Sequence, residues 1–375
     1  MSQAGDAPKM AFTLHQLLQL MIQHGASDLH ITAGCQPKVR MHGKLEDVNV
    51  GTTLTPEMTK DLCYSILTDH QKQKFEENKE LDLSFGIRGL SRFRGNVFVS
   101  RGAVAGAFRT IPYEIPSFDQ LGLPPVVQSM AKRPRGLILV TGPTGSGKST
   151  TLASIIDDIN RREKAHILTI EDPVEFMHDH KNCVVNQREV GQDTYSFTAA
   201  LKSVLREDPD VVLIGEMRDL ETIEAGLTLA ETGHLCLATL HTNSCVQSIT
   251  RIIDVFPEAQ QSQVRTQLSF VLEGIMSQQL VPRGDRPGRQ LAIEVLVATP
   301  AIRNMIREDK LHQIYGIMQA GQEKFGMQTM NQSLFESCAA GRVTVQETLN
   351  RSGNYDEMVM LLQNAGMLEG HGRTS

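Results

Sequence analysis

The chain has 375 residues, of which 40% are hydrophobic and 21% are charged, and its formal net charge at pH 7 is −6. This length suits two or three domains with separate cores, and the composition is that of an ordinary globular protein. The acidic balance, without a long Lys/Arg block, argues against broad nucleic-acid binding. The longest apolar runs, near Leu137 and Val211, are too short to span a membrane.

The N-terminus lacks the basic region and apolar stretch of a secretory signal, so we expect a cytoplasmic location. Cysteines are scattered without a C-x-x-C pair, which favours reduced core thiols over a zinc site. The six are Cys35, Cys63, Cys183, Cys236, Cys245 and Cys338.

Residues 1–111 predict a small domain that mixes helices and antiparallel strands. Apolar residues at helical spacing predict a helix over 14–23, and Pro56 begins a second helix that runs towards Leu67. The segment 112–125 contains four prolines and predicts a linker without regular structure. The strands expected before it are 28–32, 39–42, 81–85, 92–100 and 104–109.

From Val126 onward, predicted strands and helices alternate, which indicates a parallel sheet with helices on both faces. We expect this core to cover 126–298, followed by a helical region over 299–369 and a disordered tail over 370–375. The expected strands are 137–141, 166–171, 211–215, 235–240 and 291–297, and the clearest helices are 197–206, 221–230 and 260–280.

A phosphate-binding loop follows the first of these strands. The stretch from Gly142 to Thr150 matches G-x-x-x-x-G-K-[ST] and lies between a buried strand and an amphipathic helix, the context that this loop requires. Lys148 is expected to reach the β- and γ-phosphates of ATP, and the Ser149 hydroxyl to ligate Mg²⁺. The predicted binding residues are Gly142, Pro143, Thr144, Gly145, Ser146, Gly147, Lys148, Ser149 and Thr150.

Acidic residues and a histidine follow other strands of the same sheet. Strand 166–171 leads through Glu171 to Glu175, and strand 211–215 leads to Glu216. Carboxylates at this edge can hold Mg²⁺ through water and orient or deprotonate an attacking water. His241 ends strand 235–240 and His234 opens it, and a structural hydrogen bond is an alternative role for either.

These segments occur in the same order in the secretion-superfamily hexameric ATPases, and over essentially its whole length the chain resembles the type IV pilus retraction ATPases. The sharpest marker is residues 301–308, which differ from the family's retraction motif only by Met305 in place of Leu. On a helix its apolar residues form one stripe, while its arginines lie on another side and need partners outside the helix. An amphipathic surface helix is the alternative reading. The motif comprises Ala301, Ile302, Arg303, Asn304, Met305, Ile306, Arg307 and Glu308.

The resemblance implies a small PAS-like α+β N-terminal domain and a RecA-like P-loop domain with a helical C-terminus, assembled as a homohexamer. It implies that ATP binds between domains and subunits and that hydrolysis powers pilus retraction and twitching motility. The implied location is the cytoplasmic face of the inner membrane, reached only through the pilus machine. The implied partners are a membrane platform protein and possibly a paralogous retraction ATPase, without nucleic acid.

The family also implies site roles for this chain. Glu175 would be the general base with Glu171 nearby, and Glu216 would belong to the magnesium and water network. His234 and His241 would form the histidine box. Arg94 and Arg109, in the N-terminal domain, match best the arginines that approach the γ-phosphate, although Arg88, Arg92 and Arg101 are close neighbours.

Four alternatives stay open at this point. The chain could be an accessory retraction paralogue, or the opposite motor, a pilus assembly or type II secretion ATPase. The latter usually carry an extra N-terminal domain and a four-cysteine metal motif, which this sequence lacks. A nucleic-acid translocase can use the same RecA-like fold. A module that binds ATP without hydrolysing it is the fourth.

Overall fold

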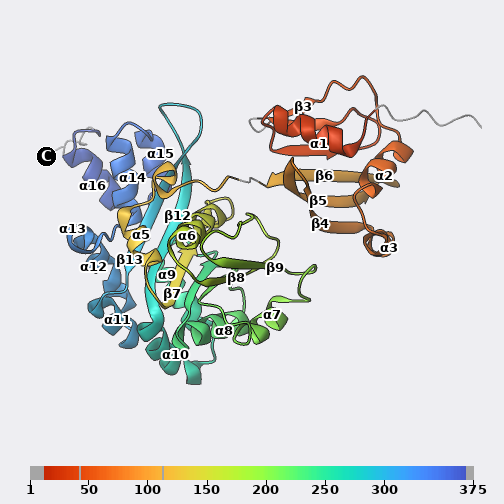
Figure 1. The fold of residues 1–375 in the computed structure, drawn as a ribbon. Coiled ribbons are helices and arrows are strands. Elements are labelled where there is room, and N and C mark those ends of the chain that lie inside the picture. The colour runs from red at the N-terminus through yellow and green to blue at the C-terminus, as the bar shows by residue number, and fades with distance from the viewer. Residues whose placement is uncertain (1–11, 42–43, 112–113, 369–375) are drawn as a thin grey trace, which may run out of the picture. The chain divides into compact units, whose positions relative to one another are not determined.

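A computed structural model describes residues 12–41, 44–111 and 114–368 (Figure 1). The chain forms two compact units that divide between Glu114 and Ile115, within the segment predicted as a linker. The prediction that this segment lacks regular structure is wrong in part. It contains the short helix α4 (Phe118–Leu121), which Ser117 caps. The predicted tail lies outside the described residues.

The N-terminal unit is a six-stranded antiparallel sheet in the order β3-β2-β1-β6-β5-β4, packed with helices in the predicted PAS-like α+β arrangement. Its core contains the fully buried rings of Phe93 and Phe108. The elements are α1 (Leu14–Gln23), β1 (Asp28–Ile31), β2 (Lys38–Met41), β3 (Lys44–Asp47), α2 (Pro56–Tyr64), α3 (Asp69–Asn78), β4 (Glu80–Ile87), β5 (Ser91–Ser100) and β6 (Ala103–Ile111).

Two elements of this unit were not predicted. Strand β3 is exposed along its whole length, and α3 buries only Phe75, so neither shows the apolar periodicity that identifies a packed element. The other predicted elements are confirmed to within three residues, apart from His42, which lies outside the described residues.

The larger unit is built on a seven-stranded sheet in the order β13-β12-β7-β11-β10-β8-β9. All its strands run parallel except β13, which pairs antiparallel with β12. The strands are β7 (Gly136–Thr141), β8 (His166–Glu171), β9 (Val184–Glu189), β10 (Val211–Ile214), β11 (Leu235–Leu240), β12 (Leu272–Pro282) and β13 (Arg289–Val297).

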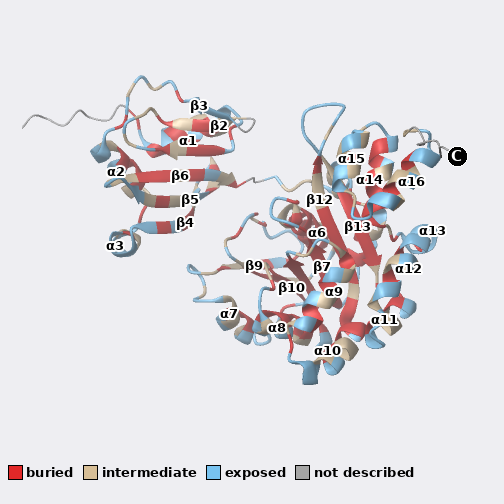
Figure 2. Ribbon diagram, turned by 180° about the vertical axis from the view of Figure 1, so that it is seen from behind, coloured by how far each residue is buried: buried red, intermediate tan, exposed pale blue. Residues whose placement is uncertain are grey.

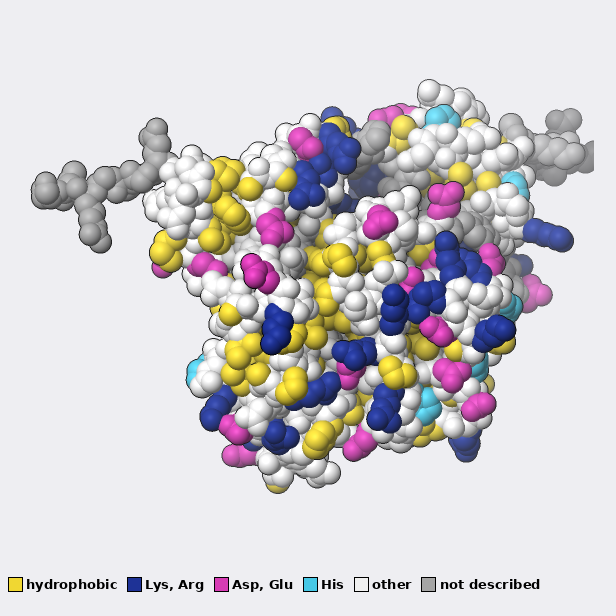
Figure 3. All heavy atoms as spheres, turned by 60° about the vertical axis from the view of Figure 1, so that its left-hand side comes forward, with side chains coloured by type: hydrophobic (Ala, Val, Ile, Leu, Met, Phe, Trp, Pro, Cys, Tyr) yellow, Lys and Arg dark blue, Asp and Glu magenta, His cyan; other side chains and the backbone are white. Residues whose placement is uncertain are grey.

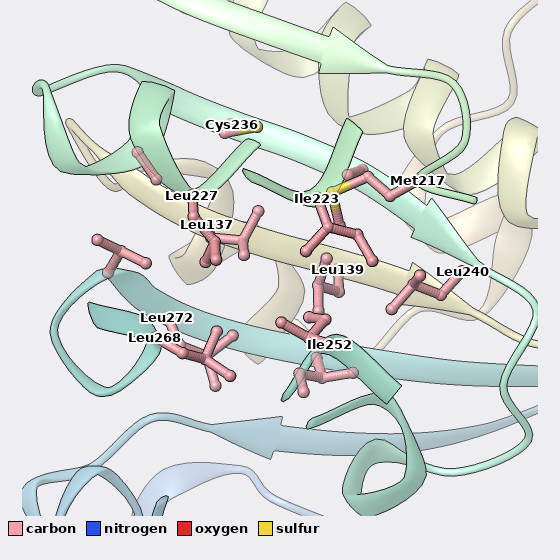
Figure 4. Packing of buried hydrophobic residues seen from close by; sticks show 14 of the residues in the cluster. Leu137, Leu139, Met217, Ile223, Leu227, Cys236, Leu240, Ile252, Leu268 and Leu272 are labelled. Atoms are coloured by element: carbon pink, nitrogen blue, oxygen red, sulfur yellow. The ribbon is translucent and has the colours of Figure 1, made fainter. Parts of the chain in front are cut away.

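Helices cover both faces of this sheet, as predicted, because successive residues of a strand point to opposite sides. Leu137 and Leu139 pack towards α7–α12 (Figure 4), whereas Ile138 and Val140 pack towards α5 and α6. The helices are α5 (Pro125–Ala131), α6 (Lys148–Arg162), α7 (Phe197–Val204), α8 (Leu220–Glu231), α9 (Cys245–Asp254), α10 (Glu258–Val271), α11 (Pro300–Arg307), α12 (Ile314–Ala320), α13 (Gln322–Phe325), α14 (Met330–Ala339), α15 (Val345–Arg351) and α16 (Tyr355–Asn364).

The predicted helix over 260–280 is wrong in its second half. Helix α10 ends at Val271, and Leu272–Pro282 is the inner strand β12, which pairs with β7 on one side and β13 on the other. Most of β12 is buried (Figure 2), and a strand buried on both faces lacks the polar alternation that would distinguish it from a helix. The β12–β7 register shifts between Leu272 and Gly274, which makes a β-bulge at Glu273.

Strand β9 was also missed, because it is a short edge strand with exposed and polar positions. The helical character of the C-terminal region is confirmed by α11–α16. All six cysteines are free, and all except the partly buried Cys35 are buried, as expected for core thiols. Within the described ranges, no helix combines the length and apolar character needed to cross a bilayer.

Candidate nucleotide site

The phosphate loop connects β7 to α6, as the sequence predicts. Three of its glycines have positive φ values, 138° at Gly142, 80° at Gly145 and 91° at Gly147, which other residues rarely adopt. Gly142 also has a steric reason to be glycine. A Cβ atom there would lie 2.3 Å from the backbone oxygen of Gln278. The sequence therefore places glycine at the three loop positions whose backbone conformation requires it.

The loop and the start of α6 fit an anion such as a triphosphate. Helix α6 has 15 residues and begins at Lys148, and its N-cap Gly147 provides no side-chain hydrogen bond to the first-turn N–H groups. Those donors and the helix dipole therefore remain available to phosphate oxygens. The Ser146 hydroxyl is buried and has no hydrogen-bond partner among the described residues, and a phosphate oxygen would supply one.

Lys148 is buried and folds back onto the loop. Its ammonium donates to the carbonyl oxygens of Gly142 at 2.8 Å and Pro143 at 3.1 Å. Burial lowers the pKa of Lys148, and the negative charges of Glu216 and Glu175 oppose that shift. The lysine thus lies at the start of the loop with both carboxylates in electrostatic range, where its positive charge can meet the terminal phosphates.

The predicted acidic residues lie at the same edge of the sheet as the loop. Strands β7, β11, β10 and β8 are parallel neighbours, so their carboxyl ends share one edge. The loop follows β7, His241 follows β11, Glu216 follows β10 and Glu171 ends β8. An open α/β sheet binds its ligand at this edge.

Glu216 is held by two neighbours. Arg218 donates to one carboxylate oxygen at 2.8 Å, and His241 Nε2 lies 3.2 Å from the other. Burial raises the pKa of Glu216, but the hydrogen bond from Arg218 and the charges of His241 and Arg218 outweigh it, so the pKa is lowered. Arg218 was not predicted as a site residue, although its position two residues after Glu216 in an irregular segment is a usable signal.

Glu171 and Glu175 differ in their surroundings. Thr169 donates to the Glu171 carboxylate at 2.6 Å and Gln187 donates at 3.3 Å, and burial raises the pKa of Glu171 to about 7. Glu175 is exposed. An exposed carboxylate can approach a bound water, whereas Glu171 is fixed in place by its donors, which suits support of the site.

His234 does not join this site within the unit. It precedes β11, and its backbone oxygen accepts from the N–H of Gly136 at the start of β7, so it lies at the edge opposite to the phosphate loop. Its Nδ1 lies 3.0 Å from the backbone oxygen of Leu229. Of the two predicted histidines, the structure brings only His241 to the carboxylates.

Arg94 and Arg109 lie in the N-terminal unit, directly opposite each other on β5 and β6, and both are exposed. Arg109 Nε donates to Asp28 at 2.7 Å. In the described parts of the chain, the side chain of Arg94 has no hydrogen bond or ion pair. Their predicted approach to a γ-phosphate stays a prediction.

The 301–308 segment forms α11 with the predicted apolar stripe, since Ile302 and Ile306 are fully buried and Met305 is partly buried. Arg303 finds its partners outside the helix, as predicted. It donates to the backbone oxygens of Ala298, Ser269 and Phe270 at 2.7–2.9 Å and to Glu273 at 2.7 Å.

For Arg307 the prediction of outside partners is wrong. It donates to Asn304 Oδ1 at 2.8 Å on the same helix and is exposed. The two arginines are one turn apart, but only Arg303 faces the end of α10, where unpaired backbone oxygens attract a guanidinium.

No cluster of three or more His, Cys, Asp or Glu residues suited to a metal occurs in the part of the chain that the structure describes. Mg²⁺ does not require one, because it usually keeps several waters and takes one or two protein ligands beside substrate phosphates. Ser149, in the first turn of α6, and Glu216, at the neighbouring strand end, are residue types that fit this pattern.

Comparison with known proteins assigns the chain to a family over nearly its whole length. Residues 2–375 match the model of the Type II/IV secretion system protein family. The type IV pilus retraction ATPase PilT of Pseudomonas aeruginosa is 47% identical over 329 residues, which cover 88% of this chain and 95% of that protein. A twitching motility protein of Neisseria gonorrhoeae is 45% identical over 350 residues, 93% of each chain.

A solved structure agrees with the fold described above. The crystal structure of the pilus retraction motor PilT with bound ADP superimposes with a TM-score of 0.88 at 51% identity and covers 93% of this chain and 99% of that one.

Proposed function

The chain belongs to the type II/IV secretion system protein family, and we propose that it is an ATP-hydrolysing motor that powers the retraction of type IV pili. The observation that carries the ATPase part is the phosphate loop, with its glycine backbone, the uncapped start of α6 and Lys148 beside two carboxylates. The retraction part is supported by the 301–308 segment and by the 47% identical retraction ATPase of P. aeruginosa.

The loop N–H groups and Lys148 would bind the β- and γ-phosphates of ATP, the substrate. Ser149 and Glu216 would hold Mg²⁺, partly through water, and the ion would neutralise charge that develops on the phosphates. Glu216 is kept ionised for this task by Arg218 and His241, which lower its pKa. His241 itself lies within reach of that carboxylate.

Glu175 would act as the general base on the attacking water. It is exposed, and it is close enough to Lys148 for its negative charge to raise the pKa of that lysine. Glu171, held by Thr169 and Gln187, would support it. Arg94 and Arg109 would supply positive charge to the γ-phosphate from an N-terminal unit, of the same or a neighbouring subunit. Such arginines accelerate phosphoryl transfer about 10³- to 10⁵-fold. His234 has no place in this scheme within one subunit.

We further propose a homohexamer that acts at the cytoplasmic face of the inner membrane on a platform protein of the pilus machine, with a paralogous retraction ATPase as a further candidate partner. A nucleic-acid partner is not part of the proposal. The net charge is −6, and on the face drawn in Figure 3 the basic side chains are interspersed with acidic and apolar ones rather than gathered in one stripe.

The test is Lys148→Ala, examined in the purified protein and in cells. We expect phosphate release from ATP to fall to background, because the charge that binds the terminal phosphates is lost. Cells that carry only this variant are expected to display abundant pili but no twitching. Lys164→Ala, an exposed lysine just beyond the same helix, is the matched control and should behave like the parent chain.

Each other outcome contradicts a specific part of the proposal. Substantial ATP hydrolysis by the Lys148→Ala variant would show that the assigned nucleotide site is not where hydrolysis takes place. Cells without pili would identify an assembly motor instead. Cells with unchanged pili and motility would leave only an accessory or redundant role.

A further inference from the structure

The phosphate loop rests on a strand that the sequence did not identify. Gln278 of β12 is 1% exposed. A Cβ atom added to Gly142 would lie only 2.3 Å from the backbone oxygen of Gln278. Two residues further along β12, the Leu280 side chain lies 3.7 Å from the corresponding Cβ position of Gly147. Strand β12 therefore lies against both ends of the loop.

The side chain of Gln278 adds a specific bond to this support. Its Nε2 donates to the Thr151 hydroxyl at 2.8 Å, and both residues are buried. Thr151 is the fourth residue of α6, and its N–H donates to the backbone oxygen of Gly147. Gln278 thus contacts Gly142 through its backbone and the first turn of α6 through its amide, on the two sides of the site that phosphates would occupy.

The neighbouring glutamine points the other way. Gln279 alternates to the opposite face of β12, and its Nε2 donates to the backbone oxygen of Arg351 at the end of α15. Gln278 and Gln279 are chemically identical and adjacent, yet one contacts the phosphate loop and the other contacts the C-terminal helices.

We propose that Gln278 is a positioning residue for the nucleotide, which fixes the distance between the Gly142 end of the phosphate loop and the first turn of α6. Phosphate binding requires several backbone N–H groups to point at one place, so a loop that is free to spread binds less tightly. The inference rests on the proposed function, because it assumes that the loop binds ATP.

The experiment compares Gln278→Leu with Gln279→Leu in the full chain. It measures the Kd of a fluorescent ATP analogue, the KM and kcat of ATP hydrolysis, and the melting temperature without nucleotide. Gln278→Leu is expected to weaken binding about 3- to 10-fold, the value of one lost hydrogen bond, and to raise KM in proportion. Gln279→Leu is expected to keep the parental Kd, even if its melting temperature falls as much.

Thr151→Val tests the same bond from the helix side and keeps the shape of the side chain. It is expected to weaken binding as Gln278→Leu does, and the double variant no further, because both changes remove one interaction. This variant also decides the matter if Gln278→Leu does not fold.

Three results would overturn the inference. They are an unchanged Kd in Gln278→Leu or Thr151→Val, an equal loss of affinity in Gln279→Leu, and multiplicative effects in the double variant. A parent chain that fails to bind the analogue would instead refute the proposed function, so the two failures are distinguishable.

Discussion

Single residues of the site differ in how their charge is controlled. Glu216 is kept ionised by Arg218 and His241, whereas burial raises the pKa of Glu171 from 4.5 to about 7. Two carboxylates at one sheet edge are therefore expected to carry different charges at neutral pH. Environments that separate the pKa values of nearby acids are typical of sites that perform acid–base chemistry.

The raised pKa of Glu171 predicts a pH-dependent cost in stability. Between about pH 4.5 and 7 the folded state binds more protons at this group than the unfolded state, so its contribution to the free energy of unfolding falls as the pH rises through this range and is constant above it. Glu171→Gln removes the titration. Relative to the parent, the variant should gain stability across that window, up to about 3 kcal/mol above pH 7.

Calorimetric unfolding between pH 5 and 8 without nucleotide measures this difference. Glu224→Gln, at an exposed position of α8, is the control and should run parallel to the parent. A Glu171→Gln curve that also runs parallel to the parent would show that the carboxyl is not buried in solution.

At the scale of elements, α11 combines two different surfaces. Its inner side buries Ile302 and Ile306 and carries Arg303, which closes the end of α10 and meets Glu273 at the bulge of β12. Glu273 in turn pairs with Arg133 at 3.2 Å. The outer side of α11 presents Arg307. The 301–308 segment therefore has a buried side that belongs to the framework and an exposed side.

Alanine substitutions of Arg303 and Arg307 are therefore predicted to have different effects on stability and motility. Arg303→Ala should destabilise the larger unit by about 2–4 kcal/mol, because it removes the donor to three backbone oxygens and leaves Glu273 with Arg133 as its remaining partner. Arg307→Ala should stay within about 0.5 kcal/mol of the parent and yet stop twitching. Thermal unfolding and motility assays of the two variants check this. Equal melting temperatures would contradict the division into inner and outer sides.

Elements with a distinctive local signal were predictable, and those specified by their neighbours were not. The phosphate loop, α6 and the strands that carry Glu171, Glu216 and His241 follow from glycine spacing and apolar runs. Strand β12 looked helical because its pairing with β7 and β13 is invisible in the sequence. Gln278 was missed for the same reason, since its contact with Thr151 joins distant segments. Arg218 lies only two residues after Glu216, and there the local signal was not used.

At the scale of the whole molecule, the two units have separate cores. Among the described residues, the buried cluster of the N-terminal unit runs from Phe12 to Phe108, and the clusters of the larger unit begin at Leu123. Each unit therefore has a core of its own.

A fragment of residues 115–368 is thus predicted to fold alone. It should unfold cooperatively within about 4 °C of the matching transition in the full chain, which corresponds to about 1 kcal/mol for a unit of this size. It should bind nucleotide but hydrolyse it slowly, because Arg94 and Arg109 are missing. Scanning calorimetry and phosphate release test both points, with residues 12–114 as the companion fragment. An unfolded 115–368 fragment, or one with parental turnover, would contradict these expectations.

The bulge at Glu273 has a consequence for the gene as well as for the protein. It sets the phase of β12, so that Gln278 faces the phosphate loop and Gln279 faces α15. Loss of one codon between the bulge and Gln278 would shift the rest of the strand by one residue, so that Gln279 would take the place of Gln278 at the phosphate loop and Leu280 would take the place of Gln279 beside α15. The number of residues between the bulge and Gln278 is therefore constrained, even where the identity of those residues is not. Codons added after Pro282, in the connection to β13, would leave both contacts intact.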